Sequence, residues 1–313
     1  MVVLVLFWFL FGLLIRECLT TESAPIMRLK NSSCSPFLSR LQPTIQKGLH
    51  DILPNEHFMD FIKKSSPPGS DILLLDVDKH TWAMSLNQAA ALKRVGSGLI
   101  VHVMAYERDI CQNFAKYDVP CFYDAAWLVA LDKAYVKWTG RDIVDLKMLS
   151  VIMMGRMVAS LITLCVGYNV FLSDSDVVFY RDPLDYVFAD VDIMVTSTMI
   201  GPSHDWGAPY FVDKVPFYTL NNGVVYYRRN PTTQSFLTTL TGNSIAHLMK
   251  GPDTHLAFLQ TIFNGYMQKH KLKLHPARLV VLHYLCILHT VHGNILYLIY
   301  LGAAKLATTL HSS

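Results

Sequence analysis

From residue 71 onward, short apolar runs of strand length alternate with longer stretches that favour helices. This alternation is typical of an α/β fold, because helical crossovers join parallel strands and cover both faces of their sheet. The sequence therefore predicts a mostly parallel sheet with helices on both faces. The expected strands are residues 71–77, 99–105, 119–123, 169–172, 191–196 and 223–227, and the expected helices are residues 85–94, 109–116, 145–166, 232–249 and 252–270.

The composition limits the class of protein. Hydrophobic residues make up 52% of the 313 positions and charged residues only 16%, which excludes a disordered chain and favours a well-buried sheet or some membrane contact. The net charge is +3 and no basic block stands out, so nothing points to nucleic acid as a partner.

The chain begins with an apolar run, residues 2–15, that stops at Arg16. A membrane-spanning helix needs about 20 apolar residues. We therefore expect residues 1–16 to be a signal peptide or a short signal anchor. If uncleaved, this segment contacts the membrane and makes the chain a type II membrane protein of the Golgi or endoplasmic reticulum lumen; if cleaved, the chain is secreted. A glycosylation pattern at Asn31 fits luminal exposure.

Residues 17–70 are expected to form a stem or lead-in, because a Ser-Ser-Pro-Pro-Gly-Ser break at residues 65–70 precedes the regular alternation. The main domain is then expected at residues 71–310. Near its end, residues 279–301 carry no charge. This tail is either a second membrane segment or, as its histidines and Gly293 favour, a buried pair of strands.

Six cysteines occur, and no two have the spacing of a metal-binding Cys-x-x-Cys pair. Cys111 and Cys121 are close enough in sequence to form a disulfide in an oxidising compartment. The alternative is that both are small buried hydrophobic residues.

Two carboxylates follow the strand expected at residues 169–172. Asp174 and Asp176 bracket Ser175, so their side chains point the same way on an extended backbone. Ligands of open α/β sheets bind beyond the carboxyl ends of the strands. Two such oxygen ligands can hold a hard divalent cation, which in turn binds the phosphates of a nucleotide. The alternative is a solvated turn in which both acids cap local backbone.

Arg156 is a lone basic residue on the Met-rich helix expected at residues 145–166. A strand of about 17 Å matches about eleven residues of helix, and counting back from Gly167 reaches Arg156. We therefore expect Arg156 to lie beside the two acids, either as a contact to a diphosphate or as a structural ion pair with one of them.

Residues 167–183 contain Gly-Tyr-Asn, an apolar run, Asp-x-Asp-Val and Arg-Asp-Pro. This block resembles the nucleotide-diphospho-sugar transferase domain of glycosyltransferase family 77, which includes plant xylosyl- and arabinosyltransferases. Residues 222–228, Asn-Gly-Val-Val-Tyr-Tyr-Arg, and the late His292-x-Asn294 are also similar to family segments. The resemblance implies a GT-A-like fold with a Rossmann-like sheet, Mn²⁺ or another divalent cation, a UDP-sugar donor, a glycan or glycoprotein acceptor, and retention of anomeric configuration.

The resemblance also assigns roles to individual residues. Asp174 and Asp176 would bind the metal and the donor, with His292 as a third metal ligand and Lys305 at the diphosphate. Asn222 and Gly223 would line the sugar pocket. Asp78 and Glu107, which follow the first two expected strands, would meet the uridine, and Arg156 stands where the family has a basic residue.

One departure bears on catalysis. The family has an Asp-Gln pair before a helical Asn, whereas this chain has Leu259-Gln260 before Asn264. Asp253 lies earlier on the same expected helix. Either Asp253 substitutes for the missing acid and acts with Gln260, or the activity is lost.

Two other functions compete with sugar transfer. The strand at residues 71–77 contains Asp76 and is followed by Asp78, the arrangement in which haloacid-dehalogenase-type phosphohydrolases place a nucleophile and an acid/base. The position where such enzymes have Thr is His80 here. The third possibility is a non-catalytic protein that binds a sugar nucleotide, which the absence of an acid at residue 259 would favour.

Overall fold

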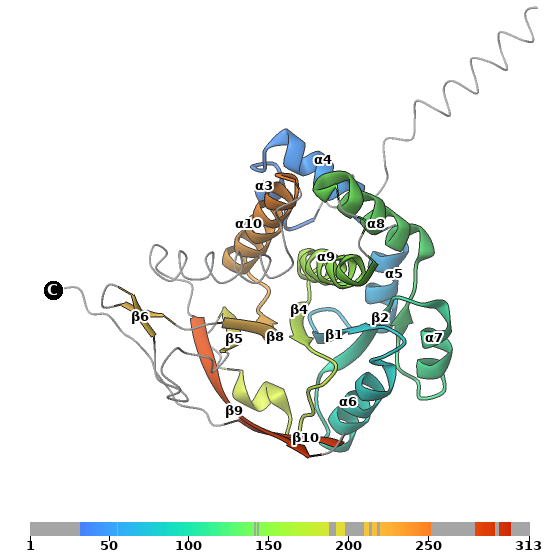
Figure 1. Ribbon diagram of the computed structural model, residues 1–313, viewed down its shortest axis with the longest axis vertical. Coiled ribbons are helices and arrows are strands. Elements are labelled where there is room, and N and C mark those ends of the chain that lie inside the picture. Colours follow the sequence, from blue (N-terminus) through green and yellow to red (C-terminus); the bar gives the residue numbers. More distant parts are fainter. Residues whose placement is uncertain are drawn as a thin grey trace, which may run out of the picture.

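The computed structural model describes residues 32–54, 56–140, 142, 144–187, 192–197, 210–212, 215–217, 220–251, 279–291 and 294–301. In this part of the chain, eight strands form one sheet in the order β10-β9-β5-β8-β4-β1-β2-β3 (Figure 1). They are β1 (Asp71–Val77), β2 (Ile100–Ala105), β3 (Cys121–Phe122), β4 (Asn169–Ser173), β5 (Ile193–Ser197), β8 (Leu220–Tyr227), β9 (Leu279–Val291) and β10 (Asn294–Leu301). The strands β6 (Tyr210–Val212) and β7 (Val215–Phe217) pair separately.

The sheet has a parallel half and a mixed half. Strands β3, β2, β1 and β4 pair in parallel, so their carboxyl ends meet at one edge. Strand β8 runs antiparallel to both β4 and β5, while β9 is parallel to β5. The predicted α/β fold with a mostly parallel sheet is confirmed.

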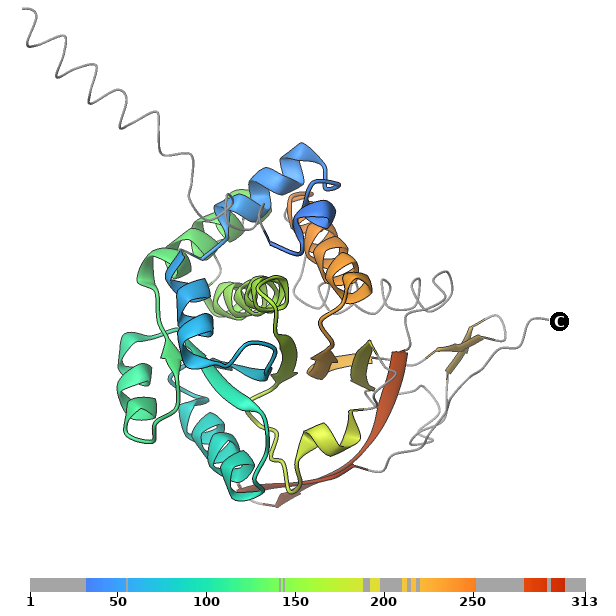
Figure 2. The ribbon, with the colours of Figure 1, turned by 180° about the vertical axis from the view of Figure 1, so that it is seen from behind.

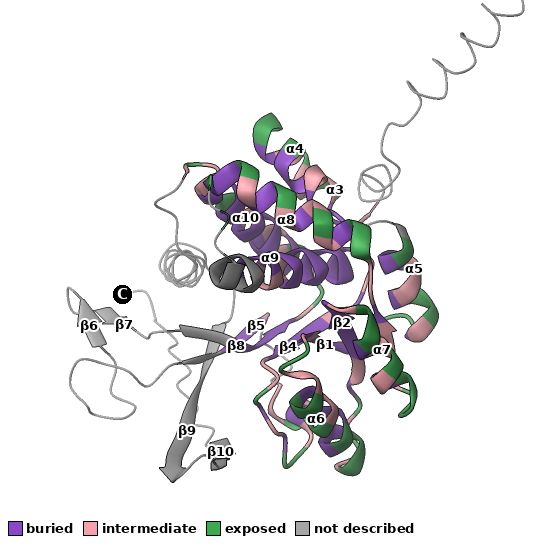
Figure 3. Cartoon of the chain, turned by 45° about the vertical axis from the view of Figure 1, so that its right-hand side comes forward, coloured by how far each residue is buried: buried purple, intermediate pink, exposed green. Residues whose placement is uncertain are grey.

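Helices cover both faces of the sheet, as Figures 1 and 2 show from opposite sides. On one face lie α4 (Pro43–Asp51), α8 (Ala125–Thr139), α9 (Val144–Cys165) and α10 (Pro231–Leu248), and α6 (Trp82–Arg94) lies on the other. The remaining helices are α3 (Ser35–Leu38), α5 (Glu56–Ser65), α7 (Arg108–Ala115) and the 3₁₀ helix η1 (Pro183–Tyr186). Figure 3 shows that the described side chains of α9 are mostly buried, whereas α6 and α8 each expose one side.

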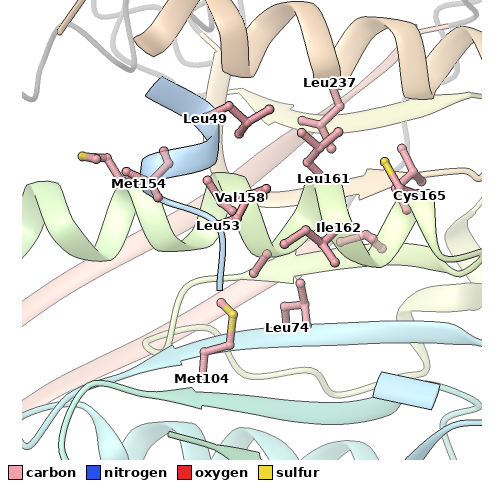
Figure 4. Packing of buried hydrophobic residues seen from close by; sticks show 14 of the residues in the cluster. Leu49, Leu53, Leu74, Met104, Met154, Val158, Leu161, Ile162, Cys165 and Leu237 are labelled. Atoms are coloured by element: carbon pink, nitrogen blue, oxygen red, sulfur yellow. The ribbon is translucent and has the colours of Figure 1, made fainter. Parts of the chain in front are cut away.

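Strand alternation separates two hydrophobic cores. Successive side chains of a strand point to opposite faces, so in β1 Ile72 and Leu74 join the core under α9, and Leu73 and Leu75 join the core toward α6 and α7. Figure 4 shows the α9 core, where Met154, Val158, Leu161 and Ile162 pack with residues from the sheet and other helices. A helix that is apolar around its circumference must be buried in this way.

The helices α3, α4 and α5 correct the expected domain boundary. Their residues Leu49, Phe58 and Ile62 are buried in the α9 core, and Cys34 forms a disulfide with Cys165 at the end of α9, with 5.2 Å between the Cα atoms. Residues 34–65 thus belong to the packed domain and not to a stem. Sequence analysis missed this because these helices are short, and their apolar sides find a partner only in the folded core.

A second disulfide joins Cys111 of α7 to Cys121 of β3. It confirms the disulfide alternative for this pair of residues. The pair Cys34–Cys165 was not predicted, since its sequence separation of 131 leaves no local signal.

The uncharged tail forms β9 and β10, an antiparallel pair, so the pairing of strands expected for this tail is confirmed. Of the helices that the structure describes, none has the length and apolarity needed to cross a bilayer. The N-terminal run at residues 1–16 and the helix expected at residues 252–270 lie outside the described residues.

Helix α8 was not predicted, although it carries clear end signals. Asp124 precedes it and accepts hydrogen bonds from the backbone N–H groups of Ala126 and Trp127, and Gly140 ends it in the left-handed conformation with φ 65°. Aspartate at the start and glycine at the end are the preferred capping residues of a helix.

Candidate functional site

The acids Asp174 and Asp176 follow β4 at the carboxyl edge of the parallel strands. Contacts on both sides hold this turn. The backbone N–H of Asp174 donates to the carbonyl of Gly223 in β8 at 2.6 Å, and the hydroxyl of Ser175 donates to the carbonyl of Asp76 in β1 at 3.0 Å. The motif is therefore fixed in place by its two neighbouring strands.

Both carboxylates reach solvent. The Asp174 side chain is 45% exposed, and Asp176 is exposed. Partial desolvation, and next the negative charge of Asp174, raise the pKa of the Asp176 carboxyl. Two neighbouring carboxylates whose charges repel each other form an oxygen-rich site that a hard cation would suit.

Arg156 of α9 lies beside these acids, as helix counting predicts. Its Nη1 is 2.6 Å from Oδ1 of Asp174, and its Nε is 3.4 Å from Oδ2 of Asp76. The side chain is only 8% exposed. Burial lowers the pKa of Arg156, but the two carboxylates outweigh this effect and the pKa is raised. The structural ion pair is thus observed, while a contact to a diphosphate stays a prediction.

Asp76 lies in the interior below the turn. Its side chain is 9% exposed and accepts a hydrogen bond from the hydroxyl of Tyr106 at 3.0 Å. Burial raises the pKa of Asp76 to about 7, against the opposing effects of Arg156 and Tyr106. Tyr106 follows β2 directly, and its hydroxyl is also 3.1 Å from the carbonyl of Ile152 in α9. Sequence analysis did not identify Tyr106, because no local pattern links it to α9.

Asp78 and Glu107 follow β1 and β2 at the same edge of the sheet. Oδ1 of Asp78 accepts hydrogen bonds from the backbone N–H groups of His80 and Thr81 and from the Thr81 hydroxyl, so Asp78 organises the turn that enters α6. Burial, and next the charge of Asp78, raise the pKa of Glu107, whose Oε2 is buried without a hydrogen-bond partner. Their predicted contact with uridine is not tested by these observations.

The Arg-Asp-Pro block has a structural role through Asp182. Its carboxylate accepts hydrogen bonds from the Ser97 hydroxyl at 2.7 Å, from the Gly98 backbone at 3.2 Å and from the Leu184 backbone at 3.0 Å. These bonds anchor the chain that leaves the acidic turn to the loop before β2.

The remaining predicted residues are only partly described. Gly223 is buried in β8, and Asn222 belongs to the same strand. Four others lie outside the described residues: Asp253, Gln260, His292 and Lys305. In the part of the chain that is described, no cluster of three or more His, Cys, Asp or Glu side chains could hold a metal ion.

The comparison with protein families decides the family of this chain. A family model described as nucleotide-diphospho-sugar transferase matches residues 102–297, more than half of the sequence. The chain belongs to this family. It is therefore a glycosyltransferase, and family membership together with the observed sheet confirms the predicted GT-A-like α/β fold.

Three solved structures similar to this chain are glycosyltransferases. Mouse xyloside xylosyltransferase 1, in its apo form, is 15% identical over 67% of this chain and 84% of its own, with a TM-score of 0.40. The galactosyltransferase LgtC, in complex with donor and acceptor sugar analogs, is 12% identical over 62% and 69%, with a TM-score of 0.40. GlyE from Streptococcus pneumoniae TIGR4 is 10% identical over 68% and 45%, with a TM-score of 0.34. No curated protein matches the chain.

The family match and the surroundings of Asp76 and Asp78 both contradict the phosphohydrolase alternative. That mechanism requires Asp76 as an accessible nucleophile. Instead, the Asp76 carboxylate is buried against Arg156 and Tyr106, and Asp78 is engaged by the turn into α6.

Proposed function

We propose that this glycosyltransferase moves a sugar from a UDP-sugar donor to a hydroxyl group of a glycan or glycoprotein, with a divalent cation and with retention of anomeric configuration. The observation that carries the proposal is the pair Asp174 and Asp176. Both acids reach solvent at the carboxyl edge of parallel strands, in a family whose donors carry a diphosphate. Ligands of open α/β sheets bind at this edge.

The side chains present fit a divalent cation such as Mn²⁺. Carboxylate oxygens suit hard divalent metals, and a cation would relieve the charge repulsion that helps to raise the pKa of Asp176. Asp174 and Asp176 would hold this ion, with His292 as the proposed third ligand. When bound, a divalent cation supplies stabilisation of the negative charge on a departing diphosphate.

The other side chains would bind and orient the donor. Arg156 lies beside Asp174, so its guanidinium would donate to a phosphate oxygen of the bound donor. Lys305 would also contact the diphosphate. Asp78 and Glu107 border the same edge, where the uridine would lie.

The sugar and the acceptor would meet beside the acidic turn, next to β8. Asn222 and Gly223 would line the sugar pocket, and Asp253 and Gln260 would serve catalysis. In a retaining reaction, the acceptor hydroxyl would attack from the face of the leaving group, and a UDP oxygen would take its proton. This route requires no protein nucleophile.

The two disulfides support the proposed compartment. Such bonds persist in oxidising environments, and here they join Cys34 to Cys165 and Cys111 to Cys121. We propose that the chain lies in the lumen of the Golgi or endoplasmic reticulum as a type II membrane protein, or outside the cell if residues 1–16 are cleaved. Nucleic acid is not a proposed partner.

A thermal-shift screen of UDP-sugars, with and without Mn²⁺, tests this function. A bound donor at a hundredfold excess over its Kd stabilises the fold by about 2.7 kcal/mol, which is a shift of several degrees. We expect the shift to require both Mn²⁺ and the two acids. The Asp174→Asn/Asp176→Asn variant should lose it, and an unchanged shift in that variant would reject the site.

Asp118→Asn is the matched control. Asp118 lies on an exposed turn with φ 58°, a conformation that asparagine also tolerates, so this variant loses the same kind of charge elsewhere. It should keep the full shift. The same samples also address the non-catalytic alternative: Mn²⁺-dependent UDP binding without release or transfer of sugar from any donor would favour a protein that only binds the nucleotide.

A further inference from the structure

Arg156 connects the exposed acidic turn to the interior of the domain. Its guanidinium contacts Asp174 on the turn and Asp76 below it, and Nε and Nη2 have no hydrogen-bond partner in the described structure. A buried arginine has many possible rotamers, and the direction of its planar guanidinium depends on the groups that hold it. The orientation of Arg156 toward Asp174 therefore depends on what fixes Asp76.

Tyr106 fixes Asp76 from the side of β2. Its hydroxyl lies 3.0 Å from Oδ1 of Asp76 and 3.1 Å from the carbonyl of Ile152, one helical turn before Arg156. One hydroxyl thus joins the ends of β1 and β2 to the segment of α9 that carries the arginine. The Tyr106 ring is buried, so this contact cannot relax into solvent.

Gly155 makes this contact possible. A Cβ atom at position 155 would lie 2.7 Å from the Tyr106 hydroxyl, closer than such atoms approach, whereas its next neighbours would be at 3.5 and 3.6 Å, which is ordinary contact. The glycine beside Arg156 therefore provides the space that the hydroxyl occupies. Any larger residue would push the hydroxyl away from Asp76.

We propose that Tyr106 and Asp76 are positioning residues that hold the Arg156 guanidinium against Asp174, and so keep the Asp174 carboxylate oriented for a metal-bound nucleotide diphosphate. This inference rests on the proposed function, because it assigns these residues to the same site. Both side chains are buried, so their effect on the donor would be indirect, through Arg156. Groups that support a metal ligand from behind typically change metal affinity by about 10–100-fold when they are removed.

The test measures binding of UDP in the presence of Mn²⁺ by titration calorimetry, together with the melting temperature, on the full chain. We expect Tyr106→Phe and Asp76→Asn each to weaken binding by about 10-fold. Tyr106→Phe keeps the buried ring, so its melting temperature should change little. If Asp76→Asn fails to fold, Tyr106→Phe alone decides the outcome.

A steric rescue separates positioning from general stability. Gly155→Ala should weaken UDP binding by about 10-fold when the hydroxyl is present. In Gly155→Ala/Tyr106→Phe, the added methyl group meets only atoms at ordinary contact distances, so the double variant should bind as well as Tyr106→Phe alone. An equal loss from Gly155→Ala in both backgrounds would refute the role of the hydroxyl.

The remaining outcomes distinguish this inference from the proposed function. If the wild-type chain binds UDP with Mn²⁺ and Asp174→Asn abolishes binding, but Tyr106→Phe and Asp76→Asn bind normally, the positioning role is wrong and the site stands. Variants that melt earlier but bind UDP normally would likewise assign Tyr106 and Asp76 to folding alone. Absence of Mn²⁺-dependent binding by the wild-type chain rejects the proposed function and this inference with it.

Discussion

Two acidic pairs with the same spacing stand at the ends of adjacent parallel strands, and the structure treats them differently. Asp76 lies in β1 and Asp78 follows it, and Asp174 and Asp176 follow β4. The Asp76 side chain is 9% exposed, whereas that of Asp174 is 45% exposed. Arg156 contacts one acid of each pair, so its guanidinium lies between the buried Asp76 and the more exposed Asp174.

The difference shows how one pattern acquires two roles. The β1 pair is engaged within the protein: Asp76 contacts Arg156 and Tyr106, and Asp78 accepts hydrogen bonds from the turn into α6. The β4 pair keeps oxygen atoms directed to solvent, where a ligand can use them. Two acids at the end of a strand therefore indicate a ligand site only when their neighbours leave them accessible.

The largest expected effect comes from removing the exposed pair. We expect the Asp174→Asn/Asp176→Asn variant to lose at least about 1,000-fold in metal-dependent UDP-sugar turnover, because it removes the charges that would hold the cation. Its melting temperature should change by only a few degrees, since both side chains reach solvent. Turnover equal to that of the wild type would show that Asp174 and Asp176 do not form the ligand site, and the two pairs would then not differ in function.

Removal of the positive charge of Arg156, which contacts both Asp76 and Asp174, should lower stability. Arg156→Met leaves Asp76 buried without its positive partner, which we expect to cost about 3 kcal/mol in the free energy of unfolding, measured by urea denaturation. Arg156→Met/Asp76→Asn removes both charges and should recover a large part of this loss. Additive losses in the double variant would show that the two side chains are not energetically coupled.

The buried acid should also give stability a pH dependence. The pKa of Asp76 is raised from 3.8 to about 7 in the fold, with Arg156, Tyr106 and Asp174 as the groups that face it. The folded state therefore binds this proton more tightly than the unfolded state does. The contribution of Asp76 is full below pH 3.8 and is lost as the pH rises through about 7.

This contribution is isolated by comparing the wild type with Asp76→Asn across that window. The wild-type free energy of unfolding should fall relative to the variant by up to about 1.4 kcal/mol per pH unit. Parallel curves for the two proteins would show that Asp76 has the same pKa in the folded and unfolded chain.

The smallest effect is expected at Asp78. Asp78→Ala removes the acceptor for the turn into α6 and should cost about 1 kcal/mol in the free energy of unfolding. Asp78→Asn keeps an acceptor oxygen and should cost less. If both variants also weaken UDP binding relative to Asp118→Asn, Asp78 contacts the nucleotide as well. Both acid pairs would then contribute to ligand binding, in different amounts.

Local patterns predicted much of this molecule. The strand expected at residues 71–77 is β1 with the same bounds, and the helix expected at residues 145–166 is α9 shifted by one residue. Counting along that helix placed Arg156 beside Asp174, where the structure has an ion pair. Such predictions succeed because strand and helix periods depend on neighbouring residues alone.

Features that depend on distant residues could not be predicted in this way. The disulfide between Cys34 and Cys165, the packing of α4 and α5 on the core, and the contact of Tyr106 with Asp76 each join segments far apart in the chain. Gly155 carries no local signal of its importance, because the Tyr106 hydroxyl beside it belongs to the residue that follows β2. Only the fold brings these partners together.

The sequence by itself determined the alternation of strands and helices from residue 71 onward, the position of two acidic pairs at strand ends and the family to which the chain belongs. The tertiary structure alone decided that the Asp76 carboxylate lies in the interior while Asp174 and Asp176 reach solvent. The physical reason is that the exposure and charge environment of a carboxylate depend on the side chains packed around it, and α9 and β2 supply those from elsewhere in the chain.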